Sequence, residues 1–231
     1  MEFRNFLLAA LRPDDAAALT PRLKEVTLSS GEILFEPDDP VDTLYFPSSA
    51  CISVIALMRD GRSVEIATVG RESAAGLLDV LTDCPAGARS FVQIAGAALA
   101  LKASDFRARL RESPSLMRLA LLHVRANARQ TETSVACNVT HTADGRLARW
   151  LLMTQDRVGA AAFPLTQDYM AVMTGVQRST VSVMAAGMKK AGVIDYSRGH
   201  VTILDRPRLI AHACECYATV QRQFEGLRTE G

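Results

Sequence analysis

The chain has 231 residues, of which 48% are hydrophobic, and a formal net charge of +1. This composition fits a globular protein with a real core, as one large domain or two small ones. The absence of any run of about eighteen apolar residues argues against a membrane span. Residues 1–140 hold 15 basic and 17 acidic side chains, and residues 141–231 hold 11 and 8. This mild asymmetry does not by itself establish a nucleic-acid partner.

The sequence favours a reducing compartment. Its first apolar run, residues 6–11, is too short for a secretory signal. The number of cysteines is odd, and they are scattered, which indicates reduced thiols and not a disulfide framework. They are Cys51, Cys84, Cys137, Cys214 and Cys216. We therefore expect a cytoplasmic protein.

The first half of the chain reads as a short helical segment followed by many strands. Residues 5–25 have helical character with breaks at Pro13 and Pro21. From residue 26 to about 102, short β-prone runs alternate with turn residues, which is typical of an all-β sandwich or barrel. Asp60-Gly61 is a good hairpin turn because both residues tolerate positive φ.

A long helix is predicted next. Ser104 is expected to cap a helix that ends near Pro114, and residues 115–142 contain no glycine or proline. Within that stretch a heptad-like seam recurs at steps of three and four. We interpret it as a dimer seam, with a helix buried in the chain's own core as the alternative. The seam comprises Leu116, Leu119, His123, Ala126, Gln130, Thr133 and Cys137.

The last third contains two helices joined by a glycine. Asp144-Gly145 is expected to act as a hinge before an amphipathic helix that closes at Gly159. Thr166 is a good N-cap for a helix over 167–173, and Gly175 can adopt the left-handed conformation that turns the chain sharply. The second helix begins near Gln177. Its apolar positions, at spacings of three and four, are Val181, Met184, Ala185, Met188 and Ala191.

A β-hairpin with Arg198-Gly199 at its tip completes a winged helix-turn-helix pattern. The N-terminal residues of such a second helix reach base edges in the major groove, where Arg can bind guanine O6 and N7 together. Gln177, Arg178, Ser179 and Ser182 are the predicted base-reading residues. Thr166, Thr180, Lys189, Arg198 and His200 are the predicted phosphate contacts. The alternative is a solvated helical face in an unrelated helical domain.

The order of these motifs resembles the Crp/Fnr family of bacterial transcription regulators. "GEILFEPDDPVDTLYF" and "DGRSVEIATVG" resemble its cyclic-nucleotide-binding β-roll, and "LTQDYMAVMTGVQRSTVSVMAAGMKKAGVI" closely resembles its DNA-reading motif. The resemblance implies an α+β fold in three parts. These are an effector domain over 1–112 that forms a double-stranded β-helix (β-roll), a dimerisation helix over 113–143, and a winged helix-turn-helix with a helical tail over 144–231. It also implies a homodimer that binds a near-palindromic DNA site. The bound dimer would contact RNA polymerase.

The resemblance weakens at the effector pocket. Family members that bind cyclic AMP carry a Gly-Glu pair for the ribose and, further along, Arg-Ser or Arg-Thr for the phosphate. Here Arg89-Ser90 matches the second pair, whereas Ala75 stands at the expected glutamate and Glu72 lies further upstream. We therefore take Arg89, Ser90 and Glu72 as effector candidates and do not expect cyclic AMP to bind.

In the second helix of the DNA-reading motif, Arg178-Ser179-Thr180-Val181 keeps the family's first arginine but lacks its glutamate, so a different half-site is expected.

No cofactor or metal is predicted. No cysteine cluster precedes Cys51, which argues against an iron–sulfur cluster. His123 or His141 could ligate haem, but a lone histidine on a helix is more often structural. In "HACECY", His212 and Cys216 would share a helix face, a weak zinc pattern that we interpret as helix packing.

The sequence also bears on two other classes of function. No catalytic carboxylate pair, nucleophile elbow or phosphate loop is present, so we predict that the protein is not an enzyme. A small-molecule or redox sensor of the same architecture, whose β-roll binds an effector other than cyclic AMP and gates DNA binding, is the alternative to a regulator with a degenerate pocket.

Overall fold

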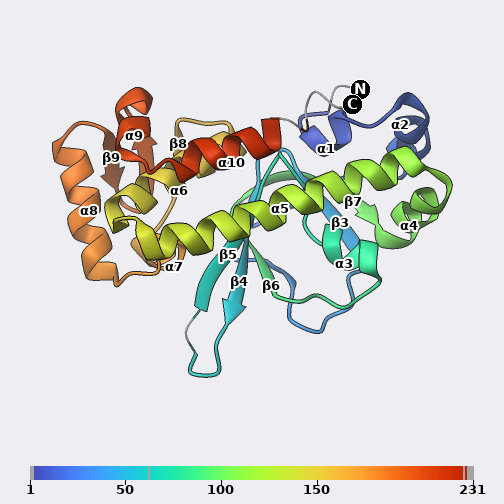
Figure 1. Ribbon diagram of the computed structural model, residues 1–231, viewed down its shortest axis with the longest axis horizontal. Coiled ribbons are helices and arrows are strands. Elements are labelled where there is room, and N and C mark those ends of the chain that lie inside the picture. The colour runs from blue at the N-terminus through green and yellow to red at the C-terminus, as the bar shows by residue number, and fades with distance from the viewer. Residues whose placement is uncertain (1–2, 62, 226, 228–231) are drawn as a thin grey trace.

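The computed structural model describes residues 3–61, 63–225 and 227 (Figure 1). Two antiparallel sheets form the N-terminal β-roll, with strand orders β1-β7-β3 and β2-β6-β4-β5. Phe46, Ile52 and Val92 are fully buried in its core. The strands are β1 (Lys24–Leu28), β2 (Ile33–Phe35), β3 (Thr43–Pro47), β4 (Cys51–Leu57), β5 (Ser63–Val69), β6 (Arg89–Ile94) and β7 (Gly96–Lys102). The β-rich first half predicted from the sequence is confirmed.

Short helices flank the roll. The predicted break at Pro13 is confirmed, since Pro13 is the first residue of a helix, where its missing N–H costs nothing. One helix was not predicted, the short α3, which begins and ends at left-handed residues, Gly76 (φ +82°) and Asp83 (φ +53°). The helices are α1 (Phe6–Ala9), α2 (Pro13–Leu19), the 3₁₀ turn η1 (Thr20–Arg22), α3 (Leu77–Thr82) and α4 (Ala103–Glu112). Ser104 lies inside α4 and does not cap it.

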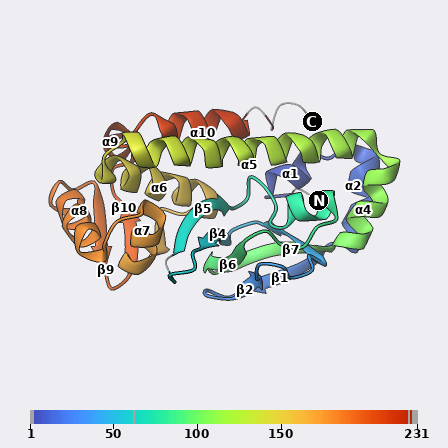
Figure 2. The same cartoon turned by 60° about the horizontal axis from the view of Figure 1, so that its bottom comes forward.

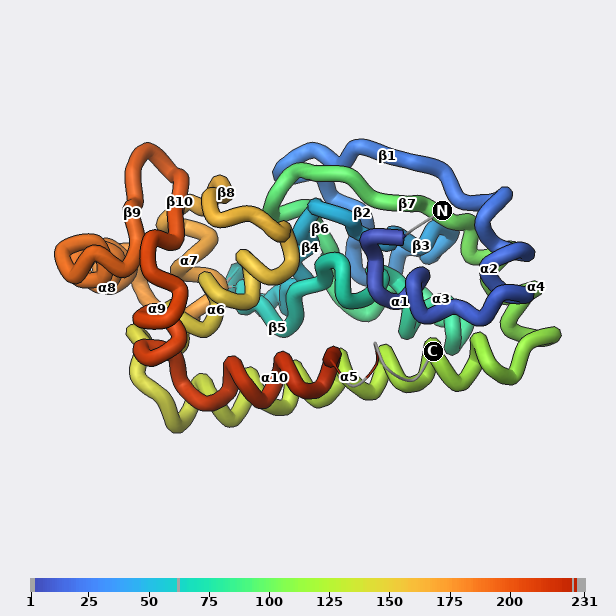
Figure 3. Tube along the Cα trace, turned by 90° about the horizontal axis from the view of Figure 1, so that it is seen from above, coloured from blue at the N-terminus to red at the C-terminus, as the bar shows by residue number. Residues whose placement is uncertain are grey.

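One helix of 27 residues, α5 (Pro114–Thr140), runs along most of the length of the molecule (Figure 2). It begins where the Ser113 hydroxyl accepts from the Leu116 amide at 3.1 Å. The last helix, α10 (Cys216–Glu225), folds back and lies alongside α5 (Figure 3). Within the described residues, no helix is long and apolar enough to cross a bilayer.

The C-terminal part is a small helical domain with a three-stranded sheet of order β8-β10-β9. Its core includes Trp150, Leu151, Met170 and Val181, each at most 1% exposed. The elements are α6 (Ala143–Val158), β8 (Ala162–Pro164), α7 (Gln167–Thr174), α8 (Arg178–Lys190), β9 (Ile194–Ser197), β10 (His200–Ile203) and α9 (Arg206–His212).

The predicted hinge at Asp144-Gly145 is wrong. Both residues lie in the first turn of α6, which Thr142 caps by accepting from the Gly145 amide at 3.3 Å. The chain breaks earlier, at His141, where ψ is 153°. The Thr142 N-cap satisfies a free amide in the first turn of α6, so the new helix begins before Asp144-Gly145 and includes both residues.

The predicted dimer seam faces inward. Leu116 packs in the roll core, Ala126 packs with the C-terminal core, and Gln130 is fully buried. Leu119, His123 and Cys137 are buried as well, and Thr133 is half-buried. The apolar spacing of these residues therefore reflects the packing of α5 on its own chain. This agrees with the alternative of a helix buried in the chain's own core. The outward face of α5 is a different one.

Candidate nucleic-acid interface and effector region

The two helices α7 and α8 meet at Gly175. The hydroxyl of Thr166 accepts from the Tyr169 amide at 3.3 Å and begins α7. Gly175, with φ +67°, ends α7, and its amide donates to the Ala171 carbonyl at 2.9 Å. Only glycine adopts this conformation without a Cβ penalty, so the turn places α8 directly after α7.

Helix α8 separates a buried face from an exposed face. Val181, Met184, Ala185 and Met188 are at most 6% exposed and anchor the helix. The predicted base-reading residues lie at the exposed N-terminus of α8. Gln177, Arg178 and Ser179 are exposed there, and Ser182 is half-buried and donates to Gln167 Oε1 at 2.8 Å.

Among the residues that the structure describes, Arg178 has one weak ion-pair partner. Its Nη1 lies 3.5 Å from Asp168 Oδ1, and the two side chains are 66% and 69% exposed. Exposed pairs of this kind contribute at most about 1 kcal/mol. The guanidinium is therefore free to exchange this carboxylate for a stronger acceptor.

The predicted phosphate contacts surround this helix but are not equally free. Lys189 is held by Asp195 at 2.7 Å and by the Tyr196 carbonyl at 3.1 Å. Arg198 lies at the tip of the β9–β10 hairpin with φ +49°, and His200 follows it; both are exposed. Thr180 is also exposed, and Thr166 is the exposed cap of α7.

The effector candidates do not share one site. Arg89 Nε on β6 lies 2.7 Å from Glu36 Oε2, and each side chain is about one third exposed, at 34% and 36%. Ser90 is 6% exposed. Ala75 stands where family members that bind cyclic AMP carry a glutamate. It is 2% exposed and exchanges backbone hydrogen bonds with Tyr45.

Glu72 belongs instead to the junction between the roll and the helices. Arg157 Nε of α6 donates to Glu72 Oε1 at 2.8 Å, and its Nη2 donates to Gln130 Oε1 of α5 at 2.6 Å. Gln130 in turn donates to the Thr68 carbonyl of β5 at 3.3 Å. The network is buried and links the end of β5 to α5 and α6, across 62 and 85 positions of sequence.

The cysteines near the C-terminus lie differently from the prediction. The paired face of His212 and Cys216 does not form, because the chain leaves the helical conformation between α9 and α10. The structure instead brings Cys214 and Cys216 to Cys137 and His141 of α5. The i, i+4 pair Cys137/His141 and the Cys-x-Cys motif are sequence signals for such a cluster that the prediction did not use.

Two family models match this chain, one at the β-roll and one at the C-terminal domain. A cyclic nucleotide-binding domain matches residues 25–113, and a Crp-like helix-turn-helix domain matches residues 145–212. The chain belongs to the Crp/Fnr family of transcription regulators. Crp-like helix-turn-helix regulators bind DNA and commonly act as dimers.

Known proteins of the Crp/Fnr family resemble it along most of its length. A CRP-like cAMP-activated global transcriptional regulator of Mycobacterium tuberculosis is 24% identical over 217 residues, which are 91% of this chain and 97% of that protein. FixK2 from Bradyrhizobium japonicum has a similar structure, with a TM-score of 0.71 and 18% identity over 83% of this chain and 98% of that one. The c-di-GMP responsive regulator CLP of Xanthomonas campestris gives a TM-score of 0.65 and 14% identity over 83% and 99%.

Proposed function

We propose that this Crp-like regulator acts as a homodimer that reads a near-palindromic promoter site and contacts RNA polymerase there. The observation that carries the proposal is the exposed N-terminus of α8, which has no acidic residue in its first turn. A dimer of such helices reads two half-sites about one helical turn apart.

Each predicted DNA contact has a chemical role in this proposal. Arg178 binds a guanine edge in place of Asp168, and Gln177 offers a donor and an acceptor to adenine. Ser179 and Ser182 supply hydroxyls on the same face. Thr166, Thr180, Lys189, Arg198 and His200 would contact phosphates, which set register but carry no sequence information.

The outward face of α5 supports dimerisation with a second copy. Leu121, Ala128 and Val135 recur at seven-residue intervals on this face, all exposed, and Val139 follows at 83% exposure. A seven-residue apolar repeat is the pattern of a two-helix seam. Because the residues of the predicted seam are buried inside the chain, we place the dimer contact on this opposite face.

The effector domain is proposed to have a degenerate cyclic-nucleotide pocket. Arg89 is neutralised by Glu36, and Ala75 has no carboxylate for a ribose hydroxyl. The second candidate, an effector other than cyclic AMP that gates DNA binding, is favoured by the same ion pair. An anion able to displace the partly exposed Glu36 would gain a bidentate partner in Arg89.

The test compares two variants on DNA selected from a random library by the wild-type protein. Arg178→Ala should lower affinity for the selected site by about 1–3 kcal/mol per half-site and leave random DNA nearly unaffected. Lys189→Ala, on the same helix, should weaken both DNAs alike. If Arg178→Ala leaves the ratio of specific to random affinity unchanged, α8 does not read bases through this residue.

A further inference from the structure

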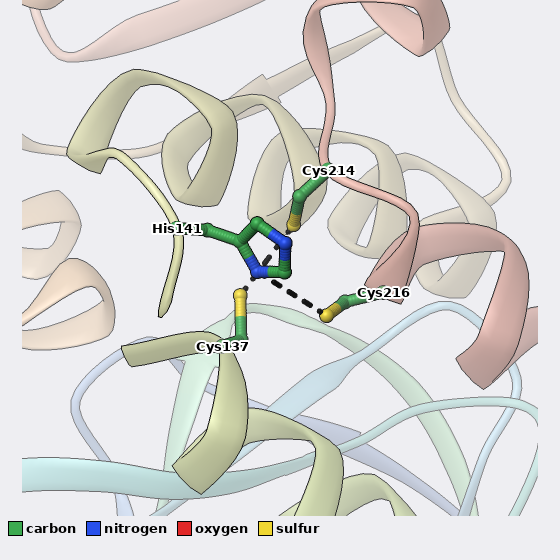
Figure 4. Close-up of side chains that lie close together, drawn as sticks. All are labelled: Cys137, His141, Cys214 and Cys216. Carbon is green, nitrogen blue, oxygen red and sulfur yellow. Dashed lines mark hydrogen bonds between the residues drawn. The ribbon is translucent and has the colours of Figure 1, made fainter. Parts of the chain in front are cut away.

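Four metal-ligating side chains converge where α5 meets the tail (Figure 4). Cys137 and His141 come from the last turn of α5 and its C-cap, Cys214 from the link between α9 and α10, and Cys216 is the first residue of α10. Their ligand atoms all lie within 4.8 Å of one another. Cys137 Sγ is 3.4 Å from Cys214 Sγ, and Cys216 Sγ is 3.6 Å from His141 Nδ1.

The Cys137–Cys214 and Cys216–His141 separations fit one tetrahedral ion. Zn–S bonds of about 2.3 Å and Zn–N bonds of about 2.0 Å place neighbouring ligand atoms roughly 3.5–3.8 Å apart in a tetrahedron. An iron–sulfur cluster holds its thiolates further apart, because several iron and sulfide atoms lie between them. All four side chains are buried or half-buried, and the three cysteines are free thiols. Three thiolates and one imidazole form a ligand set of structural zinc sites.

A carboxylate supports the histidine. His141 Nε2 lies 3.0 Å from Glu215 Oε2, a distance at which Nε2–H donates a hydrogen bond to the carboxylate. Nδ1 then has its lone pair on the side of Cys216, where the Thr140 hydroxyl also lies 3.2 Å away. A metal-bound histidine typically donates the N–H of its second ring nitrogen to a carboxylate in this way, which orients the ring and raises its basicity.

A buried arginine supplies the matching charge. Arg149 of α6 is fully buried; Nη1 donates to Ser134 at 3.3 Å, while Nε and Nη2 are without a hydrogen-bond partner among the described residues. Ser134 lies on α5, one turn before Cys137. Zn²⁺ with three thiolates and one neutral imidazole has a net charge of −1, which would balance this guanidinium.

We propose that Cys137, His141, Cys214 and Cys216 bind one Zn²⁺ ion per chain. The ion would fasten the start of α10 to the end of α5, beside the break that separates the long helix from the DNA-binding domain. Arg146 connects this point to the helix-turn-helix, since it donates to the His141 carbonyl at 2.8 Å and to the Thr174 carbonyl, at the end of α7, at 2.9 Å. The site does not depend on the proposed DNA contacts.

The experiment measures metal in the full-length protein. The protein is purified under reducing conditions, loaded with Zn²⁺, dialysed against a weak chelator, and analysed by elemental mass spectrometry. We expect about one zinc per chain. Replacing Zn²⁺ with Co²⁺ should give the intense visible bands of a tetrahedral ion together with thiolate charge-transfer bands, and this spectrum requires no variant.

Matched variants identify the ligands. Cys214→Ser and His141→Ala should lose stoichiometric zinc. Cys84→Ser, an exposed cysteine outside the cluster, and His212→Ala, the neighbouring histidine, should retain it. Glu215→Gln should bind zinc roughly 10–100-fold more weakly while keeping the tetrahedral cobalt spectrum.

Several results would overturn the proposal. The wild-type protein could retain no stoichiometric metal. It could contain iron with acid-labile sulfide at the site, or a Cys137–Cys214 disulfide in the reduced preparation. Zinc content unchanged in Cys214→Ser would also overturn it. If Cys214→Ser does not fold, the cobalt spectrum of the wild type and the affinity of Glu215→Gln still decide the question.

Discussion

Glu65 on β5 is a buried acid whose protonation should make stability depend on pH. Its side chain is 4% exposed and accepts from the hydroxyls of Ser53 and Thr68, the latter at 3.2 Å. Burial raises the pKa of Glu65 to about 7, although the Ser53 hydroxyl and the charges of Arg157 and Arg149 act in the opposite direction.

Whether stability rises or falls with pH depends on whether the folded or the unfolded state holds the proton of Glu65. Below about pH 4.5 the carboxyl is protonated in both the folded and the unfolded protein. Between about pH 4.5 and 7 the folded protein keeps the proton and the unfolded chain releases it, so stability falls as pH rises. A shift of about 2.5 pKa units at ~1.36 kcal/mol each gives a loss of roughly 3 kcal/mol, complete just above pH 7.

The assay is urea unfolding of the wild type and of Glu65→Gln from pH 4.5 to 8, followed by the fluorescence of the buried Trp150. Glu65→Gln has no proton to release, so it should gain about 3 kcal/mol relative to the wild type across this range. Burial lowers the pKa of His123 to about 4, but this histidine is present in both proteins and cancels. Glu25→Gln, on the exposed side of β1, is the control. A difference between wild type and Glu65→Gln that stays constant with pH would refute the reasoning.

Three further results are expected. Arg157→Met should cost about 3–5 kcal/mol in urea unfolding because it leaves Glu72 buried without its partner, and adding Glu72→Met should restore much of that loss. Leu121→Glu with Val135→Glu should give a folded monomer by sedimentation; an unchanged dimer would contradict the outward face of α5 as the contact. Calorimetry should detect no sub-micromolar binding of cyclic AMP, and tight binding would show that another group replaces the glutamate absent at Ala75.

The strands and the helix-turn-helix could be predicted because their signals are local. Asp60-Gly61 marks the β4–β5 turn, and Gly175 marks the turn between α7 and α8, each through the backbone conformation that glycine permits. The predicted seam residues of α5 are buried or half-buried in their own chain for a physical reason. Apolar spacing shows that a helix face is buried but not what covers it, and Leu116 is covered by the roll of its own chain. Glutamate at Leu116 should therefore unfold the chain before it separates a dimer.

The buried networks could not be predicted, because their members meet only in the fold. Cys137 and Cys214 are 77 positions apart in sequence, and Glu72 and Arg157 are 85 apart. A pattern search on one helix pairs His212 with Cys216, since it assumes that α9 continues. The break between α9 and α10 turns Cys214 toward α5 instead.

Two contacts give the roll a physical path to the DNA-reading helices. Glu72 is tied to α6 through Arg157, so its carboxylate is already committed and is unsuited to bind a ribose. Arg89 lies on β6 two residues before Phe91, on the same strand face, and Phe91 stacks on Tyr169 of α7 with ring centroids 5.8 Å apart. An anion that replaces Glu36 on Arg89 would therefore act on the strand that packs against the helix-turn-helix. We therefore expect an effector of this chain to act through Arg89 and β6, without the ribose carboxylate that Ala75 lacks.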